Sequence, residues 1–224
     1  MNNPMDRFRA MGKGLISDDE FVETLKSITT QTLEILRAEP TTVYYPTAFV
    51  LLKDVNSMAN KNEMAMIEIN NIPEDKEDQD RLFQMLGKQL HQINNSFPAA
   101  IFIATEAWAV LAEADTLVSP ETKISCHPDR QWMITISGLS MDQRSCMAAI
   151  ELDNNSVNMK AINTNVYPQS PCGWVTSQAR FAEMFYVGYA QEMVEKMVNK
   201  KPDIPPVMNL KNLLTNIDWG FTLH

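Results

Sequence analysis

The residues best suited to chemistry lie in a polar segment between two predicted strands. Glu106 and Trp108 follow a run of apolar residues, and His127, Asp129 and Arg130 come shortly before the next such run. Segments at the ends of strands often carry functional side chains, because the sheet is rigid while its loops are free to vary. We therefore take Glu106, His127, Asp129 and Arg130 as the candidate catalytic residues.

Two roles for Glu106 are open on the sequence. A carboxylate that leaves a buried strand can have a raised pKa and act as a general base, with His127 or Asp129 as its partner. Alternatively, Glu106 pairs with Arg130 and holds the loop in place, which is the commoner role for such groups. We favour the structural role.

The same segment follows a zinc signature only in part. His127-Pro128-Asp129 and the later Pro171-Cys172 lie in the order of the H-x-E and P-C-x-x-C motifs of zinc deaminases. However, Asp129 replaces the glutamate, and Val175 stands where the second cysteine ligand is required. No C-x-x-C pair occurs among the three cysteines. We expect no metal and no cofactor.

Other single residues do not form a catalytic motif. Ser140 in the sequence GLSMD lacks the second glycine of the G-x-S-x-G elbow. His91 falls on the predicted exposed side of its helix. The chain has only seven glycines, so loops that cradle phosphate are not expected.

Two short motifs resemble a pattern found in uncharacterised bacterial and phage proteins. A strand ends in Glu-Ala-Trp at Glu106–Trp108, and Pro-Asp-Arg at Pro128–Arg130 leads into another strand. The resemblance covers about residues 47–152. It implies no activity, because none is known to us for those proteins.

Residues 1–14 have no sustained apolar period and predict a flexible lead-in. A helix then follows, because Ser17 and Glu20 form a capping box and the pattern continues to Pro40. Its apolar stripe contains Phe21, Leu25, Ile28 and Ile35.

The next segments predict a hairpin, a helix and a central strand. Residues 43–52 and 64–69 are rich in β-branched and aromatic side chains, with polar turn residues between them. Pro73 suits the first turn of a second helix, which places Leu82, Leu86, Leu90 and Ile93 on one face. Ala99–Ala104 is apolar at every position, as expected for a strand covered on both faces.

The second half of the chain predicts three more strands and a long helix. The strands are expected at 131–137, 145–152 and 157–166, with a turn at 153–156 joining the last two. Alternation of apolar and polar residues in 145–152 predicts a half-exposed strand. The helix is expected at 176–199, with an apolar side that contains Phe181, Met184, Phe185, Tyr189, Met193, Met197 and Val198.

Together these elements predict an α+β fold with a mixed, mainly antiparallel sheet of about five to six strands. A crossover helix and flanking N- and C-terminal helices complete it. We expect one domain at 15–200, followed at 201–224 by a proline-containing linker and an apolar tail. The tail keeps Leu210, Leu213, Trp219 and Phe221, so it is expected to dock, either on its own core or on a second subunit.

Composition narrows the classes of partner. The 224 residues carry a formal net charge of -9 and no basic patch, which argues against nucleic acid. No apolar run approaches the ~20 residues of a membrane span, and none follows the N-terminus as in a signal peptide. The odd number of widely spaced cysteines suits a reducing compartment, so we expect a cytoplasmic protein.

Two functions are therefore considered. The first is a non-catalytic binding or assembly protein that forms oligomers or binds a protein partner, because the methionine-rich helices and apolar tail suggest contact surfaces. The second is a hydrolase with Glu106 as base and His127, Asp129 and Arg130 around the substrate. We favour the first, because the catalytic set is incomplete.

Overall fold

The computed structural model describes residues 4–38, 44–53, 62–93, 96–109, 128, 130–153, 161–167, 177–199 and 221–223. Its centre is strand β3 (Phe97–Ala109), in which Ala99–Ala104 are each at most 1% exposed. A strand without polar side chains over six residues is stable only where both faces are covered. The predicted central strand is confirmed.

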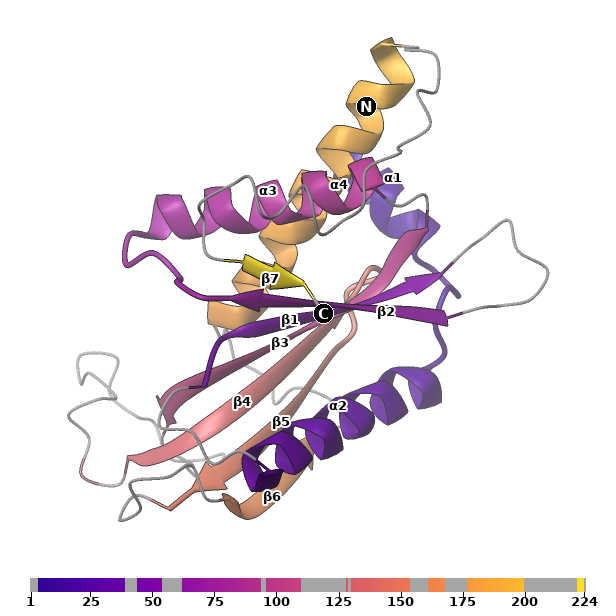
Figure 1. Ribbon diagram of the computed structural model, residues 1–224. Coiled ribbons are helices and arrows are strands. Elements are labelled where there is room, and N and C mark those ends of the chain that lie inside the picture. The colour runs from indigo at the N-terminus through magenta and orange to yellow at the C-terminus, as the bar shows by residue number, and fades with distance from the viewer. Residues whose placement is uncertain are drawn as a thin grey trace.

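The strands form one sheet in the order β6-β5-β4-β3-β1-β2-β7, and every neighbouring pair is antiparallel (Figure 1). The predicted α+β fold with flanking helices is confirmed. The sheet was expected to be mixed, but every neighbouring pair of described strands is antiparallel, and the three-residue β7 adds a seventh strand to the five to six expected. The remaining strands are β1 (Thr47–Lys53), β2 (Asn62–Ile69), β4 (Gln131–Ser140), β5 (Ser145–Leu152), β6 (Ala161–Tyr167) and β7 (Phe221–Leu223).

Helix α3 (Lys76–Ile93) is the predicted crossover helix. Strand β1 is antiparallel to both β2 and β3, so β2 and β3 run parallel with β1 between them. Parallel strands require a long connection across the sheet, and α3 provides it. Pro73 does not begin this helix as predicted. The Asp75 carboxylate instead accepts hydrogen bonds from the backbone N–H groups of Glu77 and Asp78, as an N-cap does.

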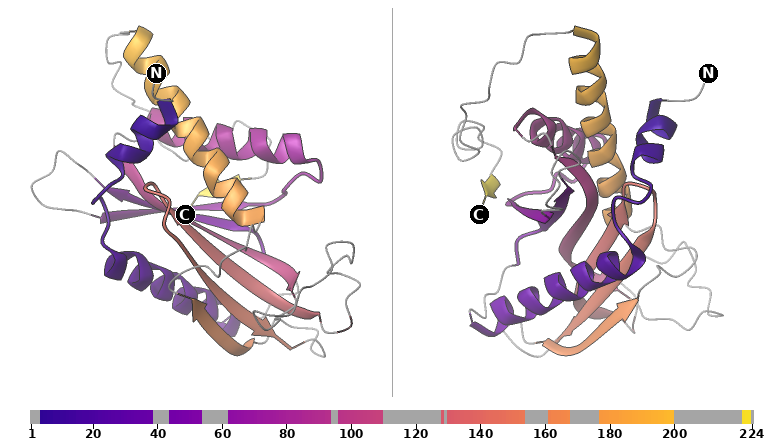
Figure 2. Two further views of the ribbon diagram at one scale, coloured as in Figure 1. Left: turned by 180° about the vertical axis from the view of Figure 1, so that it is seen from behind. Right: turned by 90° about the vertical axis from the view of Figure 1, so that its right-hand side faces the viewer.

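Helices α1 (Pro4–Met11), α3 and α4 (Ser177–Asn199) lie on one face of the sheet (Figure 2). The prediction of a flexible segment at 1–14 missed α1, whose Phe8 is 1% exposed and packs against Tyr186 and Tyr189. Helix α1 has large apolar residues at Met5, Phe8 and Met11, but of these three Phe8 alone is fully buried. Eight residues are too few for a helix that is stable by itself, so tertiary packing determines this helix.

Helix α2 (Asp18–Ala38) covers the opposite face, mainly over β4, β5 and β6 (Figure 1). The capping box is confirmed in part, because the Glu20 N–H donates to Ser17 Oγ at 3.1 Å. The predicted stripe is wrong at Ile35, which is 54% exposed. The buried face runs through Thr32 and Leu36 instead, at spacings that stay on one side of a 3.6-residue helix.

Strand β5 is not half exposed as predicted. Met147 and Ala149 on one face are as buried as Cys146 and Ala148 on the other. The residues that alternate with the apolar face include Met147 and Ala149, and small and sulfur-containing side chains are readily buried.

The end of the tail docks on its own chain. Strand β7 pairs with β2 through Ile67↔Leu223, Glu68↔Thr222 and Ile69↔Phe221. Of the two alternatives left open for the tail, the first holds for these three residues. The predicted linker at 201–220 and the turn at 154–156 lie outside the described residues.

Candidate functional site

The pairing of β3 with β4 brings two predicted site residues to one patch. In the register of these strands, Trp108 lies opposite Trp132 and Glu106 lies opposite Ile134. Side chains alternate between the faces of a strand, so Glu106, Trp108 and Trp132 share the face that carries α2. Arg130 lies two residues before Trp132. We call Glu106, Trp108, Arg130 and Trp132 the Trp–Arg patch.

Each charged residue of the patch contacts a tryptophan. The Trp132 indole N–H donates to Glu106 Oε1 at 2.5 Å. The Arg130 guanidinium lies over the Trp108 ring, 5.1 Å from its centroid, in a cation–π contact. Trp108 is 44% exposed, which is unusual for so large an apolar side chain. Trp132 packs against the buried core beneath α2.

The structure therefore brings Glu106 and Arg130 to one patch, where Glu106 binds Trp132 and Arg130 lies over Trp108. The contacts of these described residues include no direct ion pair between Glu106 and Arg130, unlike the predicted structural role. His127 and Asp129 lie outside the described residues, so their place relative to Glu106 stays a prediction. In the sequence, Trp108 stands beside Glu106, but no pattern assigns a role to Trp108 or Trp132. Their positions at facing strand ends were the available signal, but the register that pairs them follows from the fold.

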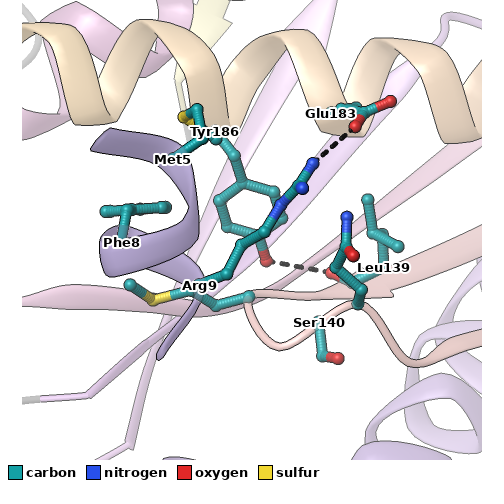
Figure 3. A pocket seen from close by; sticks show the side chains of 9 residues that line it. Met5, Phe8, Arg9, Leu139, Ser140, Glu183 and Tyr186 are labelled. Atoms are coloured by element: carbon teal, nitrogen blue, oxygen red, sulfur yellow. Dashed lines mark hydrogen bonds and ion pairs between the residues drawn. The ribbon is translucent and has the colours of Figure 1, made fainter. Parts of the chain in front are cut away.

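A small hollow lies elsewhere, between α1, α4 and the turn after β4 (Figure 3). Arg9 forms an ion pair with Glu183 at 2.8 Å across it, and the Tyr186 hydroxyl donates to the Leu139 carbonyl at 2.9 Å. Its volume is about 10 Å³, which is room for about one water molecule. Substrate pockets are typically ~300–1,000 Å³, so this hollow is part of the packing of α1.

Ser140 is used by the turn between β4 and β5. Its hydroxyl donates to Asp142 Oδ1 at 2.6 Å and accepts from the Arg144 N–H at 2.8 Å. Gln143 in this turn has a φ of 73°, a conformation that non-glycine residues adopt infrequently. Ser140 thus stabilises a strained turn, which agrees with the absence of a nucleophile motif around it.

The described cysteine is also structural. Cys146 is fully buried under α2, and its burial raises the pKa of the thiol to about 12. A thiol with a raised pKa is a poor nucleophile and a poor metal ligand near neutral pH. Within the described part of the chain, no three His, Cys, Asp or Glu side chains are grouped closely enough to hold a metal ion.

Comparison of the chain with protein-family models, with curated proteins and with solved structures found no match. Among the helices that the structure describes, none combines the length and the apolar character needed to cross a bilayer.

Proposed function

We propose that the chain is a non-catalytic binding or assembly protein of the cytoplasm that forms oligomers and uses the Trp–Arg patch to contact a protein partner. The observation that carries the proposal is the exposed Trp108 ring held under the Arg130 guanidinium. Tryptophan and arginine are the residues most enriched among those that dominate the energy of protein interfaces.

The patch is organised before any partner arrives. The hydrogen bond to Glu106 fixes the orientation of Trp132, and Trp108 stands directly across the strand pair from it. Fixed aromatic side chains lose little conformational entropy on binding, which favours affinity. The Glu106 carboxylate and the Arg130 guanidinium make the contact specific in orientation, because a partner must place an opposite charge near each of them.

The partner class follows from charge. The chain has a formal net charge of -9, so a polyanion is repelled on average. Arg130 is balanced within the patch by Glu106, which leaves no local excess of positive charge among the four residues. A protein surface with its own apolar anchor and a rim of mixed charge fits this patch better than a phosphate backbone does.

The test compares partners recovered by three forms of the full chain after cross-linking in cells. These are the unchanged protein, Trp108→Ala, and the control Ile35→Ala, which removes another exposed large apolar side chain, on α2. We expect at least one partner protein to be recovered equally by the unchanged protein and by Ile35→Ala. Its recovery by Trp108→Ala should be lower by about tenfold or more. Identical recovery by all three forms would contradict the proposed patch.

Glu106 separates this proposal from the hydrolase alternative. Glu106→Gln keeps a hydrogen-bond acceptor for the Trp132 indole but removes the base. A binding protein should keep its partner and its thermal stability after this change. A hydrolytic activity of the unchanged protein that disappears in Glu106→Gln, with stability preserved, would favour the enzyme instead.

A further inference from the structure

Strand β6 ends the sheet without protection of the kind seen at the opposite edge. In the strand order, β6 pairs with β5 on one side, and no described strand pairs with its other side. At the opposite edge, β2 carries Glu63 and Glu68 and is partly covered by β7. From Ala161 to Tyr167, β6 contains no charged residue and no proline. Edge strands without such features are templates for another strand.

The sequence of β6 is symmetric about Thr164. It reads Ile162, Asn163, Thr164, Asn165, Val166, so equal steps on either side of Thr164 meet residues of the same kind. When two copies of a strand pair antiparallel about a two-fold axis at Thr164, Asn163 of each copy faces Asn165 of the other. Thr164 faces itself. A Thr–Thr pair is favourable across strands, and no like charges are opposed.

Backbone and side-chain contacts are consistent with an edge that accepts a strand. The backbone N–H of Thr164 donates a hydrogen bond to Oδ1 of the preceding residue, Asn163, at 2.8 Å. Such a local bond satisfies a backbone donor that has no partner on an adjacent strand. Glu151 Oε1 accepts from the amides of Asn163 and Asn165, both at 3.1 Å, and so steadies the strand from the β5 side. The register with β5 shifts at Ile162, between the pairs Glu151↔Asn163 and Leu152↔Ala161, so the regular part of β6 begins at Asn163.

We infer that the outer edge of β6 pairs with β6 of a second copy of this chain, antiparallel about a two-fold axis at Thr164. The inference deepens the proposed function, since it rests on the association of copies and names the surface for it. The contact is isologous, because each copy presents the same edge in the same register. The two sheets then continue into one, and the backbone N–H groups of the edge gain ladder partners.

The test reverses charge at the axis. Thr164→Lys and Thr164→Glu each place like charges opposite one another in the inferred pair, whereas a 1:1 mixture of the two places Lys opposite Glu. Native mass spectrometry and light scattering at micromolar concentration should show a dimer of the unchanged chain. Each variant alone should raise the dissociation constant about tenfold or more, and the mixture should recover a mixed dimer. Circular dichroism must show that both variants are folded.

A conservative variant covers the case in which charge at half-buried Thr164 disturbs folding. Thr164→Cys is close in size and should form a disulfide between two copies under mild oxidation, mapped to this position by peptide analysis. The control is Met64→Cys, which places an exposed thiol on the opposite edge of the sheet. We expect a covalent dimer from the first variant and none from the control.

The outcomes separate the inference from the proposed function. A monomeric unchanged chain overturns both the inference and the oligomer in the proposed function, while the Trp108 comparison still tests the binding patch. A dimer that persists in Thr164→Lys and Thr164→Glu overturns the inference alone. Dissociated variants that do not recover on mixing also overturn it, because the two-fold register at Thr164 requires recovery.

Discussion

At the scale of single residues, His91 is a partly buried titratable group whose pKa is shifted within an accessible pH range. The sequence placed it on the exposed side of α3, but its ring lies 4.6 Å from that of Tyr189, and its Nδ1 is buried without a hydrogen-bond partner there. Burial lowers the pKa of His91 to about 4, and the charge of Lys196 adds to this effect. The reason is that α4 packs against the side of α3 that carries His91, and the apolar periodicity of α3 does not show this contact.

This lowered pKa predicts a loss of stability in acid. The ordinary histidine pKa is about 6.5, so between that pH and pH 4 the unfolded chain binds more protons than the folded one. The stabilisation is full above about pH 6.5 and is lost as the pH falls through about 4. Because the residue is only half-buried, we expect a contribution on the order of 1 kcal/mol.

Urea unfolding at pH 7 and pH 4.5 measures this contribution, with His91→Gln as the comparison. Carboxylates titrate in the same range, but they do so in both proteins and cancel in the difference. The unchanged protein should lose more free energy of unfolding between the two pH values than the variant does. Equal losses would show that His91 is accessible to protons in the folded state.

At the scale of elements, α3 and α4 approach closely because a glycine lies on each side of their contact. A Cβ at Gly188 would lie 1.8 Å from the Gln84 carbonyl oxygen, and one at Gly87 would lie 2.0 Å from the Phe185 carbonyl oxygen. The stacked rings of Phe83 and Phe181, 4.4 Å apart, belong to the same contact. The backbones of the two helices are in direct contact here, so a Cβ at either glycine would clash with backbone atoms that cannot rotate out of the way.

The variant Gly188→Ala is therefore expected to destabilise the protein, although alanine normally favours a helix over glycine by about 1 kcal/mol. Overpacking against backbone should cost about 1–3 kcal/mol, which lowers the melting temperature by roughly 2–10 °C in a chain of this size. Differential scanning calorimetry measures it. The control Gln191→Ala, at an exposed position of α4, should leave the temperature unchanged or slightly raised.

At the scale of the whole molecule, two apolar cores share the strands between them. One core lies under α3 and α4 and includes Phe83 and Ile101, and the other lies under α2 and includes Phe102. Successive residues of β3 thus belong to different cores. Unfolding of β3 therefore disrupts both cores at once. We expect the two cores to unfold together.

The test uses one truncation in each core. Phe83→Ala and Phe102→Ala remove rings that are each fully buried, and each should cost about 3–5 kcal/mol. In both variants, calorimetry and circular dichroism should report one transition at a lower temperature. Two separate transitions, with each variant shifting only its own, would show that the cores are independent.

The sequence predicted the fold where a single local rule applies. Ala99–Ala104 is apolar at every position, and Ser17 with Glu20 marks a helix start regardless of what packs nearby. It failed where burial depends on a distant element, as at Ile35, at Phe8 and in β5. For the candidate site, it placed Glu106 and Arg130 in one polar segment, but their contacts with Trp132 and Trp108 come from the pairing of β3 with β4.

By itself the sequence therefore determined the fold class, the central strand and the order of the three longer helices α2, α3 and α4. Backbone hydrogen bonding and apolar periodicity in these elements follow from neighbouring residues. Only the tertiary structure decided which residues meet. The register of β3 on β4 sets Trp108 against Trp132 and places each beside a charged residue, and the strand order leaves β6 at an edge. These are contacts between residues remote in sequence, and a local pattern does not encode their register.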